Sequence, residues 1–242
     1  MGHCLFMRKG EVHTAPVTGV LASSLAVGST VKLMEGGTAV EYLVVNQGIP
    51  SNSNLYDASC DGTWLLRKDI HSNQVWNNRQ ANAYADSTIN TWLNGTFFNS
   101  FGSVEQSTIK QVKIPYRNNG GSGGTTQQGA NGLLCKVFLL SAPEVHYENV
   151  SIDSGEGAAL NYFASCSVNN SDPKRVASRS GSAANWWLRS PSSSETVYAW
   201  AVYADGNCSR IATMNASGVR PAVILPGNAL FDETTMLLKG VK

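Results

Sequence analysis

NWWLRSP, at residues 185–191, and GVRPA, at residues 218–222, are the two stretches that decide the fold. The first places two tryptophans beside an arginine and ends on a proline, a pattern typical of a buried segment with a sharp stop. The second runs into Val223-Ile224-Leu225, which we expect to form the final buried strand. Arg189 and Arg220 stand among apolar residues. We therefore expect both guanidinium groups to be partly buried and to bond backbone carbonyls or a carboxylate.

The segment between these stretches reads as a β-hairpin. Tyr198–Tyr203 predicts a strand, Asp205-Gly206 is a common hairpin turn, and Cys208–Met214 predicts the returning strand. Asp205-Gly206-Asn207 could also supply oxygen ligands to Ca²⁺, but it lacks the acidic repeat of a calcium loop, so we interpret it as a turn. Trp200, like Trp186 and Trp187, is expected to lie in the core.

Working outward, the N-terminal half predicts one hairpin and two short helices. Val31–Leu33 and Val40–Val45 flank a Glu-Gly-Gly turn and alternate in polarity, which predicts paired strands. Asp86–Phe101 places its apolar residues on one helical face, with Asp86 or Ser87 as the N-cap. Ser103 and Gln106 have the spacing of a capping box, so we expect a second helix over Ser103–Lys110.

The middle of the chain alternates between loop and strand signals. Pro115 follows an alternating segment and favours an edge position for it. Gly120–Gly132 is rich in Gly, Ser and Thr but lacks the Lys-Ser/Thr ending of a phosphate-binding loop, so we expect a flexible connection. Leu133–Leu140 predicts a buried strand. Residues 1–20 have no periodic pattern and read as a tail or linker.

Composition limits the class of protein. The 242 residues suffice for one large domain, 42% of them are hydrophobic, and only 14% are charged against about 25% in an ordinary soluble chain. A net charge of +1 offers no electrostatic attraction for nucleic acid or an anionic membrane. No apolar run approaches the ~20 residues of a membrane span, and the N-terminus does not read as a secretory signal.

Residue types that carry catalysis are sparse. The five cysteines include no CxxC pair, which favours free thiols, with one disulfide left open. Four histidines are present, two of them (His3 and His13) in the expected tail, and neither GxSxG nor HExxH occurs. The acidic residues are dispersed and predict no carboxylate pair. We therefore expect no enzyme activity, no metal site and no cofactor.

WLRSP and GVRPA together resemble the end of a family of bacterial and phage proteins of unknown function found in gut bacteria and their prophages. The blocks WLL at 64–66, ADSTINTWL at 85–93 and IKQVKIPY at 109–116 resemble the same family, so the likeness extends from about Leu25 to Pro226. That family is similar to the C-type lectin-like variable proteins of diversity-generating retroelements. The resemblance implies an α+β, C-type lectin-like fold: small antiparallel sheets, two short helices and much irregular structure. It also implies a domain over 21–242 with a variable-type segment at about 189–222.

In those retroelements, a reverse transcriptase copies a template with errors at adenines. Asn codons then become many residue types, but never Trp, Met, Lys, Glu or Gln. Trp200, Val202, Asp205 and Gly206 are expected to belong to a fixed frame. Glu195 and Met214 fall outside the set and need another codon or a fixed position. Twelve residues between Pro191 and Gly218 fit the variable set and are our candidate ligand-binding residues: Ser192, Ser193, Ser194, Thr196, Tyr198, Ala201, Tyr203, Ala204, Ser209, Arg210, Ile211 and Thr213. The frame beneath them is expected to consist of Trp186, Trp187, Arg189, Trp200 and Arg220.

The resemblance implies a binding protein that recognises a protein or glycan target on a cell surface, through an exposed face built from Ser192–Thr213. A phage tail tip or a bacterial surface is the expected location. One alternative is an oxidase similar to formylglycine-generating enzymes, whose fold is also C-type lectin-like; those enzymes use a pair of C-terminal cysteines with copper, and here only Cys208 lies nearby. Another is a structural module without a partner. Oligomeric state is left open.

Overall fold

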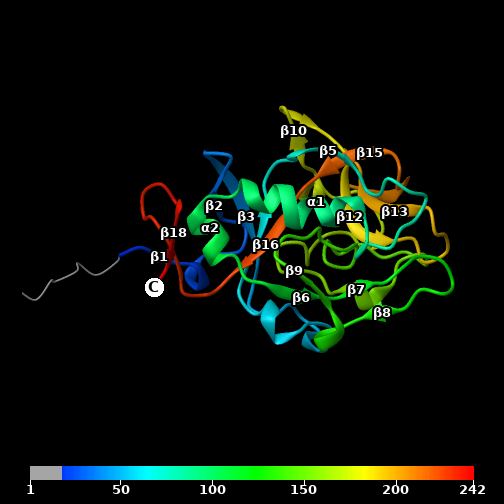
Figure 1. The fold of residues 1–242 in the computed structure, drawn as a ribbon, viewed down its shortest axis with the longest axis horizontal. Helices are drawn as coiled ribbons and strands as arrows, with labels where there is room; N and C mark the ends of the chain where they lie inside the picture. The colour runs from blue at the N-terminus through cyan, green and yellow to red at the C-terminus, as the bar shows by residue number, and fades with distance from the viewer. Residues whose placement is uncertain (1–17) are drawn as a thin grey trace, which may run out of the picture.

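The structure is a computed structural model that describes residues 18–242. Small antiparallel sheets make up most of the fold, and its helices are few and short (Figure 1). Most of the expected tail, with His3, His13 and Cys4, lies outside the described residues. Val20 pairs with Phe231, so the paired part of the chain begins before residue 21.

A four-stranded antiparallel sheet forms one half of the molecule, in the order β16-β4-β3-β2. It contains the predicted N-terminal hairpin, whose turn at Gly36-Gly37 has positive φ angles of 54° and 81° that suit glycine. The hairpin strands are therefore confirmed. The sheet consists of β2 (Thr30–Glu35), β3 (Thr38–Gln47), β4 (Thr63–Arg67) and β16 (Ala222–Leu225).

A five-stranded sheet forms the other half, in the order β14-β13-β12-β15-β5. All its pairs are antiparallel except β12 with β15. The predicted hairpin is present as β13 and β14, and Gly206 in its turn has φ +81°. The strands are β5 (Ser72–Val75), β12 (Trp186–Pro191), β13 (Tyr198–Val202), β14 (Cys208–Ala212) and β15 (Ala216–Val219).

The GVRPA stretch passes from one sheet to the other. Val219 pairs with Ser72 in the five-stranded sheet, and Ala222 pairs with Leu66 in the four-stranded sheet. Arg220-Pro221 is the crossing point, where the proline ends one ladder without an unpaired N–H. The strand Val223–Leu225 is confirmed, but it is not the last: β17 (Ala229–Phe231) and β18 (Leu238–Val241) follow it.

These last strands join β1 (Val20–Leu21) in a three-stranded sheet, order β1-β17-β18, at one end of the molecule (Figure 1). The first described strand and the C-terminus therefore lie side by side, as expected. Three two-stranded pairs complete the fold: β6 (Val112–Ile114) with β9 (Leu133–Cys135), β7 (Tyr116–Arg117) with β8 (Thr126–Gln127), and β10 (Ser178–Arg179) with β11 (Ser182–Ala183).

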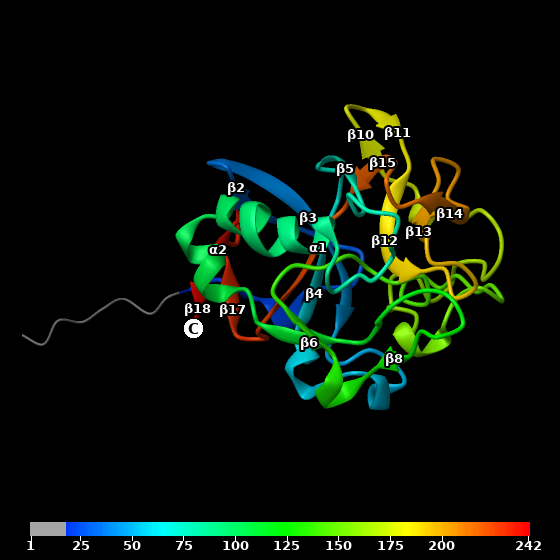
Figure 2. The same cartoon turned by 45° about the vertical axis from the view of Figure 1, so that its right-hand side comes forward.

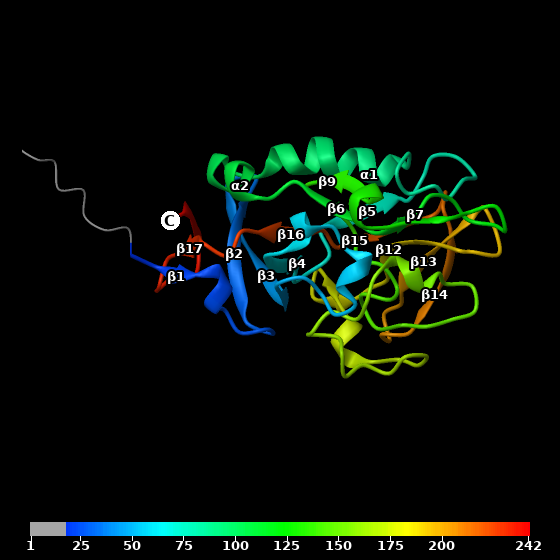
Figure 3. The same cartoon turned by 90° about the horizontal axis from the view of Figure 1, so that it is seen from below.

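The helical segments between residues 88 and 108 run along one side of the sheets (Figure 3). Ser87 is the N-cap of α1 (Thr88–Trp92), and its hydroxyl accepts the backbone N–H of Asn90 at 3.2 Å, as predicted. The segment then continues as a π-helical turn, Leu93–Phe97, with Gly95 at its centre, and a 3₁₀ turn, Phe98–Ser100. The predicted single helix is thus three consecutive turns of different pitch.

The second helix, α2 (Ser103–Thr108), begins one residue earlier than the capping-box prediction requires. Gly102 is its N-cap, and the Gln106 side chain donates to the backbone oxygen of Phe101 at 2.7 Å. The capping-box prediction is therefore wrong, because Gln106 bonds Phe101, the residue before the N-cap, rather than the N-cap residue.

Only the first three residues of the predicted strand Leu133–Leu140 are in a strand, and Leu134 is 55% exposed. The rest is buried, irregular backbone. Its polar groups are satisfied from elsewhere: Leu139 N–H donates to the Tyr84 hydroxyl at 3.0 Å, and Leu140 oxygen accepts Arg189 N–H at 2.9 Å. Phe138 makes one antiparallel bridge to Ala222 of β16, with N–H to oxygen distances of 3.0 and 2.8 Å. The prediction of a continuous strand is wrong because this single bridge and scattered contacts, rather than a ladder, bond the segment.

Candidate functional site

The candidate ligand-binding residues lie on β13, β14 and the three loops beside them, at the edge of the five-stranded sheet (Figure 2). Five of the twelve are exposed and four are partly buried. The exposed ones are Ser194, Thr196, Ala204, Ser209 and Arg210, and the partly buried ones are Ser193, Tyr198, Tyr203 and Ile211.

Ser192, Ala201 and Thr213 are buried, which contradicts their expected exposure. The backbone oxygen of Ser192 accepts Gly121 N–H at 3.2 Å, so the loop around Gly121 covers it. Ala201 lies on the inner strand β13 between Trp187 and Ser209. Thr213 is covered by the segment after β5, whose Arg79 backbone oxygen accepts its hydroxyl at 3.2 Å. These three cannot be displayed to a ligand.

Strand alternation divides the remaining residues between two sides of the sheet. Trp200 pairs with Arg210, and Ala199 pairs with Ile211. Since directly paired residues share a side and neighbours point to opposite sides, Arg210 and Ile211 face opposite ways. The single continuous face that we expected is therefore two surfaces.

The first surface, which we call the Arg210 patch, consists of Ser194, Glu195, Tyr198 and Arg210. The Arg210 guanidinium lies over the Tyr198 ring at 5.9 Å and pairs with the Glu195 carboxylate at 2.6 Å. Its Nη1 also donates to the Ser194 hydroxyl at 3.3 Å. Both members of the ion pair are well exposed, so the pair contributes at most ~1 kcal/mol to stability and is free to exchange for a ligand.

The second surface surrounds a hollow of about 420 Å³, which we call the Tyr203 hollow. Tyr203 and Ile211 line it together with Arg179 from the β10–β11 hairpin and Ser217 from β15. Ser217 is only 6% exposed, and its hydroxyl has no hydrogen-bond partner among the described residues. A buried hydroxyl without a partner is costly, so a polar ligand atom that bonded it would be favoured.

Two other hollows lie away from the candidate residues. The larger, about 700 Å³, is lined by residues of 143–169, and the smaller, about 520 Å³, lies along α1. None of the twelve candidates lines either of them. Size alone therefore does not identify the binding surface, and the Tyr203 hollow is the one that the sequence-based candidates reach.

The predicted frame residues are all buried. Trp186, Trp187 and Trp200 each donate an indole N–H to a backbone oxygen, of Arg175, Gln74 and Ser151 at 3.0, 2.9 and 3.2 Å. These bonds fix the three rings in one orientation.

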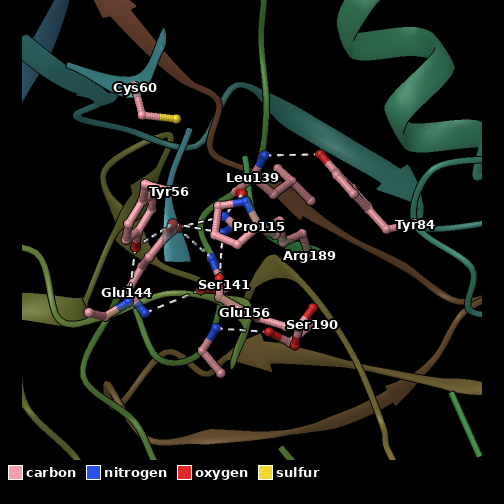
Figure 4. A network of polar contacts seen from close by, with 12 residues as sticks. Tyr56, Cys60, Tyr84, Pro115, Leu139, Ser141, Glu144, Glu156, Arg189 and Ser190 are labelled. Carbon is pink, nitrogen blue, oxygen red and sulfur yellow. Dashed lines mark hydrogen bonds and ion pairs between the residues drawn. The ribbon is translucent and has the colours of Figure 1, made fainter. Parts of the chain in front are cut away.

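Arg189 is the centre of a buried polar network (Figure 4). Its two terminal nitrogens contact the Glu144 carboxylate at 2.5 and 2.6 Å, and both side chains are completely buried. The guanidinium also donates to the backbone oxygens of Pro115, Leu139 and Glu156 at 3.0, 2.8 and 2.7 Å. Burial alone would lower the Arg189 pKa, but Glu144 outweighs it and the pKa is raised. The predicted structural role of this arginine is confirmed.

Arg220 is also structural, with a weaker set of partners. It donates to the backbone oxygen of Arg67 at 2.8 Å and lies over the Trp186 ring at 5.0 Å. Its Nη1 has no partner among the described residues, and burial lowers its pKa to about 10.

Sequence reasoning did not single out the two buried glutamates that bond Arg189. Arg189 donates to the Glu144 carboxylate and to the Glu156 backbone oxygen, although these two residues are twelve positions apart and separated from it by more than thirty. The Glu156 carboxylate instead accepts the backbone N–H of Arg117 at 3.1 Å. Glu156 is completely buried, its Oε2 has no partner among the described residues, and burial raises its pKa to about 7. The one sequence feature that could have revealed this network is Glu144 within the apolar run 137–145, because a buried charge needs a partner.

The cysteines of the described chain are all buried. Cys60, Cys135, Cys166 and Cys208 are buried and free, so the free-thiol prediction holds for these four. Burial raises the pKa of Cys208 to about 12, which keeps it from forming the thiolate that copper or an electrophile would need. Within residues 18–242 there is no cluster of three metal-ligating side chains.

A matched pair of tyrosine substitutions tests the division between buried and displayed positions. Ala201 and Ser209 are direct cross-strand partners, yet Ala201 is buried and Ser209 is exposed. Ala201→Tyr should overpack the core and cost about 1–3 kcal/mol or more, whereas Ser209→Tyr should stay within about 0.5 kcal/mol of the parent. Urea unfolding of the two variants checks this. Equal losses in both would contradict the assignment.

Comparison with known proteins gives a family but no function. A family model described as Domain of unknown function (DUF6273) matches residues 61–227, more than half of the chain, including NWWLRSP, GVRPA and the whole candidate surface. No curated protein matches this chain. No solved structure matches it either. No helix within residues 18–242 is long and apolar enough to cross a membrane. The chain belongs to the DUF6273 family of domains of unknown function.

Proposed function

We propose that this protein binds a protein or glycan target on a cell surface through the Arg210 patch and the Tyr203 hollow. In this proposal the fold is C-type lectin-like, and a diversity-generating retroelement exchanges the displayed side chains. The sheet composition agrees with the coarser α+β class. A phage tail tip or a bacterial surface is the proposed location.

One observation carries the proposal: the frame is bonded independently of the displayed side chains. Trp186, Trp187, Arg189, Trp200 and Arg220 donate to groups on residues 67–175, all outside the segment 192–213. Changing an exposed side chain on β14 or its loops therefore removes none of these bonds. A surface that does not carry the fold is the physical requirement for side chains that vary.

The displayed residue types also suit binding. Tyr198, Tyr203 and Arg210 are of the kinds that dominate interface hot spots, because they present large contact areas at a modest entropy cost. Serine and threonine around them supply adaptable hydrogen bonds. Nine positions remain in the proposed surface after the structural correction, and Ser192, Ala201 and Thr213 are removed from it.

The test is a displayed library in which only the nine accessible positions are randomised within the adenine-mutagenesis set. Selection against lysozyme as an arbitrary soluble protein should yield binders, and their melting temperatures should lie close to the parent's, because the frame bonds are intact. A control library randomises Ser192, Ala201 and Thr213 and should lose most of its folded members.

Two outcomes would contradict the proposal. In the first, the nine-position library is as poorly folded as the control library. In the second, folded members are abundant but no binder to lysozyme emerges after selection. The first outcome would show that these side chains carry the fold, and the second that they cannot form a binding surface.

A further inference from the structure

We propose that the Tyr203 hollow binds the carboxylate of an acidic sugar. This inference rests on the proposed function, because it names the ligand class for one of the two proposed surfaces. The argument uses the charge, the polar groups and the size of the hollow.

The charge of the lining is the first step. Arg179 is the one ionisable side chain that lines the hollow apart from the Tyr203 phenol, and no carboxylate lines it. Arg179 is exposed and takes part in none of the ion pairs formed between residues 18 and 242. A single unpaired guanidinium, in a hollow without an opposing acid, favours a ligand with one negative charge. Its planar fork matches a carboxylate with two parallel hydrogen bonds.

The position of Arg179 is fixed by a tight hairpin. Ser178 pairs with Ala183 and Arg179 with Ser182, and the turn residues Ser180 and Gly181 have φ angles of +52° and +83°. The Ser178 backbone oxygen also accepts Ile70 N–H at 2.9 Å, which anchors the hairpin above β5 and β15 (Figure 2). Arg179 is thus held over the hollow by paired backbone rather than by a long loop.

The neutral polar groups point to a hydroxyl-bearing ligand. Asn73, Asn185 and Asn215 line the hollow, as does Ser217, whose buried hydroxyl has no partner among the described residues. The Asn185 carbonyl already accepts Ala204 N–H at 2.9 Å, which leaves its NH₂ group as a donor. Amides and hydroxyls both donate and accept, so they pair well with sugar hydroxyls. The volume, about 420 Å³, lies within the range of small-ligand sites.

The hollow combines fixed and exchangeable parts. Arg179 and Ser217 lie outside the twelve candidate positions, whereas Tyr203 and Ile211 belong to them. The fixed residues would hold the carboxylate and one hydroxyl in every variant. The exchangeable residues would then select among sugars that share this acidic group.

The test is isothermal titration calorimetry of the full chain with glucuronate, glucose and acetate. We expect glucuronate to bind at least tenfold more tightly than glucose, which lacks the carboxylate, or acetate, which lacks the ring hydroxyls. Arg179→Gln should weaken glucuronate binding at least tenfold, Arg179→Lys should weaken it less, and Ser217→Ala should weaken it several-fold. The matched control is Arg79→Gln, an exposed arginine that lies outside both the hollow and the Arg210 patch, which should leave the affinity unchanged.

Several results would overturn the inference: no glucuronate binding by the parent chain, equal affinity for glucose or acetate, or equal losses in the Arg179 and Arg79 variants. These failures are separate from failure of the proposed function. The nine-position library leaves Arg179 and Ser217 unchanged and uses a protein target, so its binders can emerge whether or not glucuronate binds.

Discussion

Replacing Arg189 with methionine should destabilise the protein by about 3–5 kcal/mol, the largest single effect that we expect. The substitution leaves the Glu144 carboxylate completely buried and without the guanidinium that it contacts at 2.5 and 2.6 Å. It also removes the donor to the backbone oxygens of Pro115, Leu139 and Glu156. Urea unfolding at neutral pH measures the loss.

The matched control for this prediction is Arg210→Met. Arg210 also pairs with a glutamate, at 2.6 Å, but 38% of its side chain is exposed. Its loss should cost ~1 kcal/mol at most, because water replaces the partner. Arg189→Lys keeps the charge and loses the fork, so its stability should fall between those of the parent and Arg189→Met. A loss at Arg189 no larger than at Arg210 would show that the buried network does not hold the frame.

The second large effect is a dependence of stability on pH caused by Glu156. Burial raises its folded-state pKa to about 7, from an ordinary value of 4.5, because the proton keeps this completely buried group neutral. The folded state then holds a proton that the unfolded chain releases. The resulting stabilisation is fully present below pH 4.5 and is lost as pH rises to about 7, at about 1.4 kcal/mol per unit or about 3 kcal/mol in all.

Glu156→Gln should abolish this dependence of the unfolding free energy on pH. It should also leave the protein more stable than the parent above pH 7. Burial lowers the pKa of His71, which makes stability rise with pH in part of the same window. The difference between parent and variant therefore isolates Glu156 from that opposing contribution. Denaturant unfolding at pH 5, 6, 7 and 8 gives the two curves, with the exposed Glu195→Gln as control. Parallel curves for parent and Glu156→Gln would exclude the effect.

Local patterns explain which elements the sequence predicts well. The β2–β3 and β13–β14 hairpins carry their own turn residues, and Ser87 bonds the helix that it precedes. The positions of Arg189 and Arg220 indicate a structural role, because a guanidinium in an apolar run needs a polar partner nearby. In each case the deciding contacts are between neighbours in the chain, or they involve a charged residue that needs a polar partner when it is buried.

Long-range contacts explain the features of the fold and the candidate site that local sequence patterns do not predict. The Glu144 carboxylate and the Glu156 backbone oxygen reach Arg189 only when loops far apart in the chain pack together. Ser192 and Thr213 are buried by the loops that contain Gly121 and Arg79. No local sequence pattern predicts that these loops pack there. The split between the Arg210 patch and the Tyr203 hollow follows from the register of β13 and β14. The set of residue types that adenine mutagenesis permits carries no information about this strand register.

The most direct test of an exchangeable surface is the sequence of the DNA that flanks this gene. The proposal predicts a near-repeat of the DNA coding for residues 189–222, next to a reverse transcriptase gene, with differences confined to adenines of the repeat. It predicts further that these adenines fall in codons of the nine accessible positions and spare those of Ser192, Ala201 and Thr213. No such repeat, or adenine differences concentrated in the three buried codons, would contradict an exchangeable surface on a fixed frame.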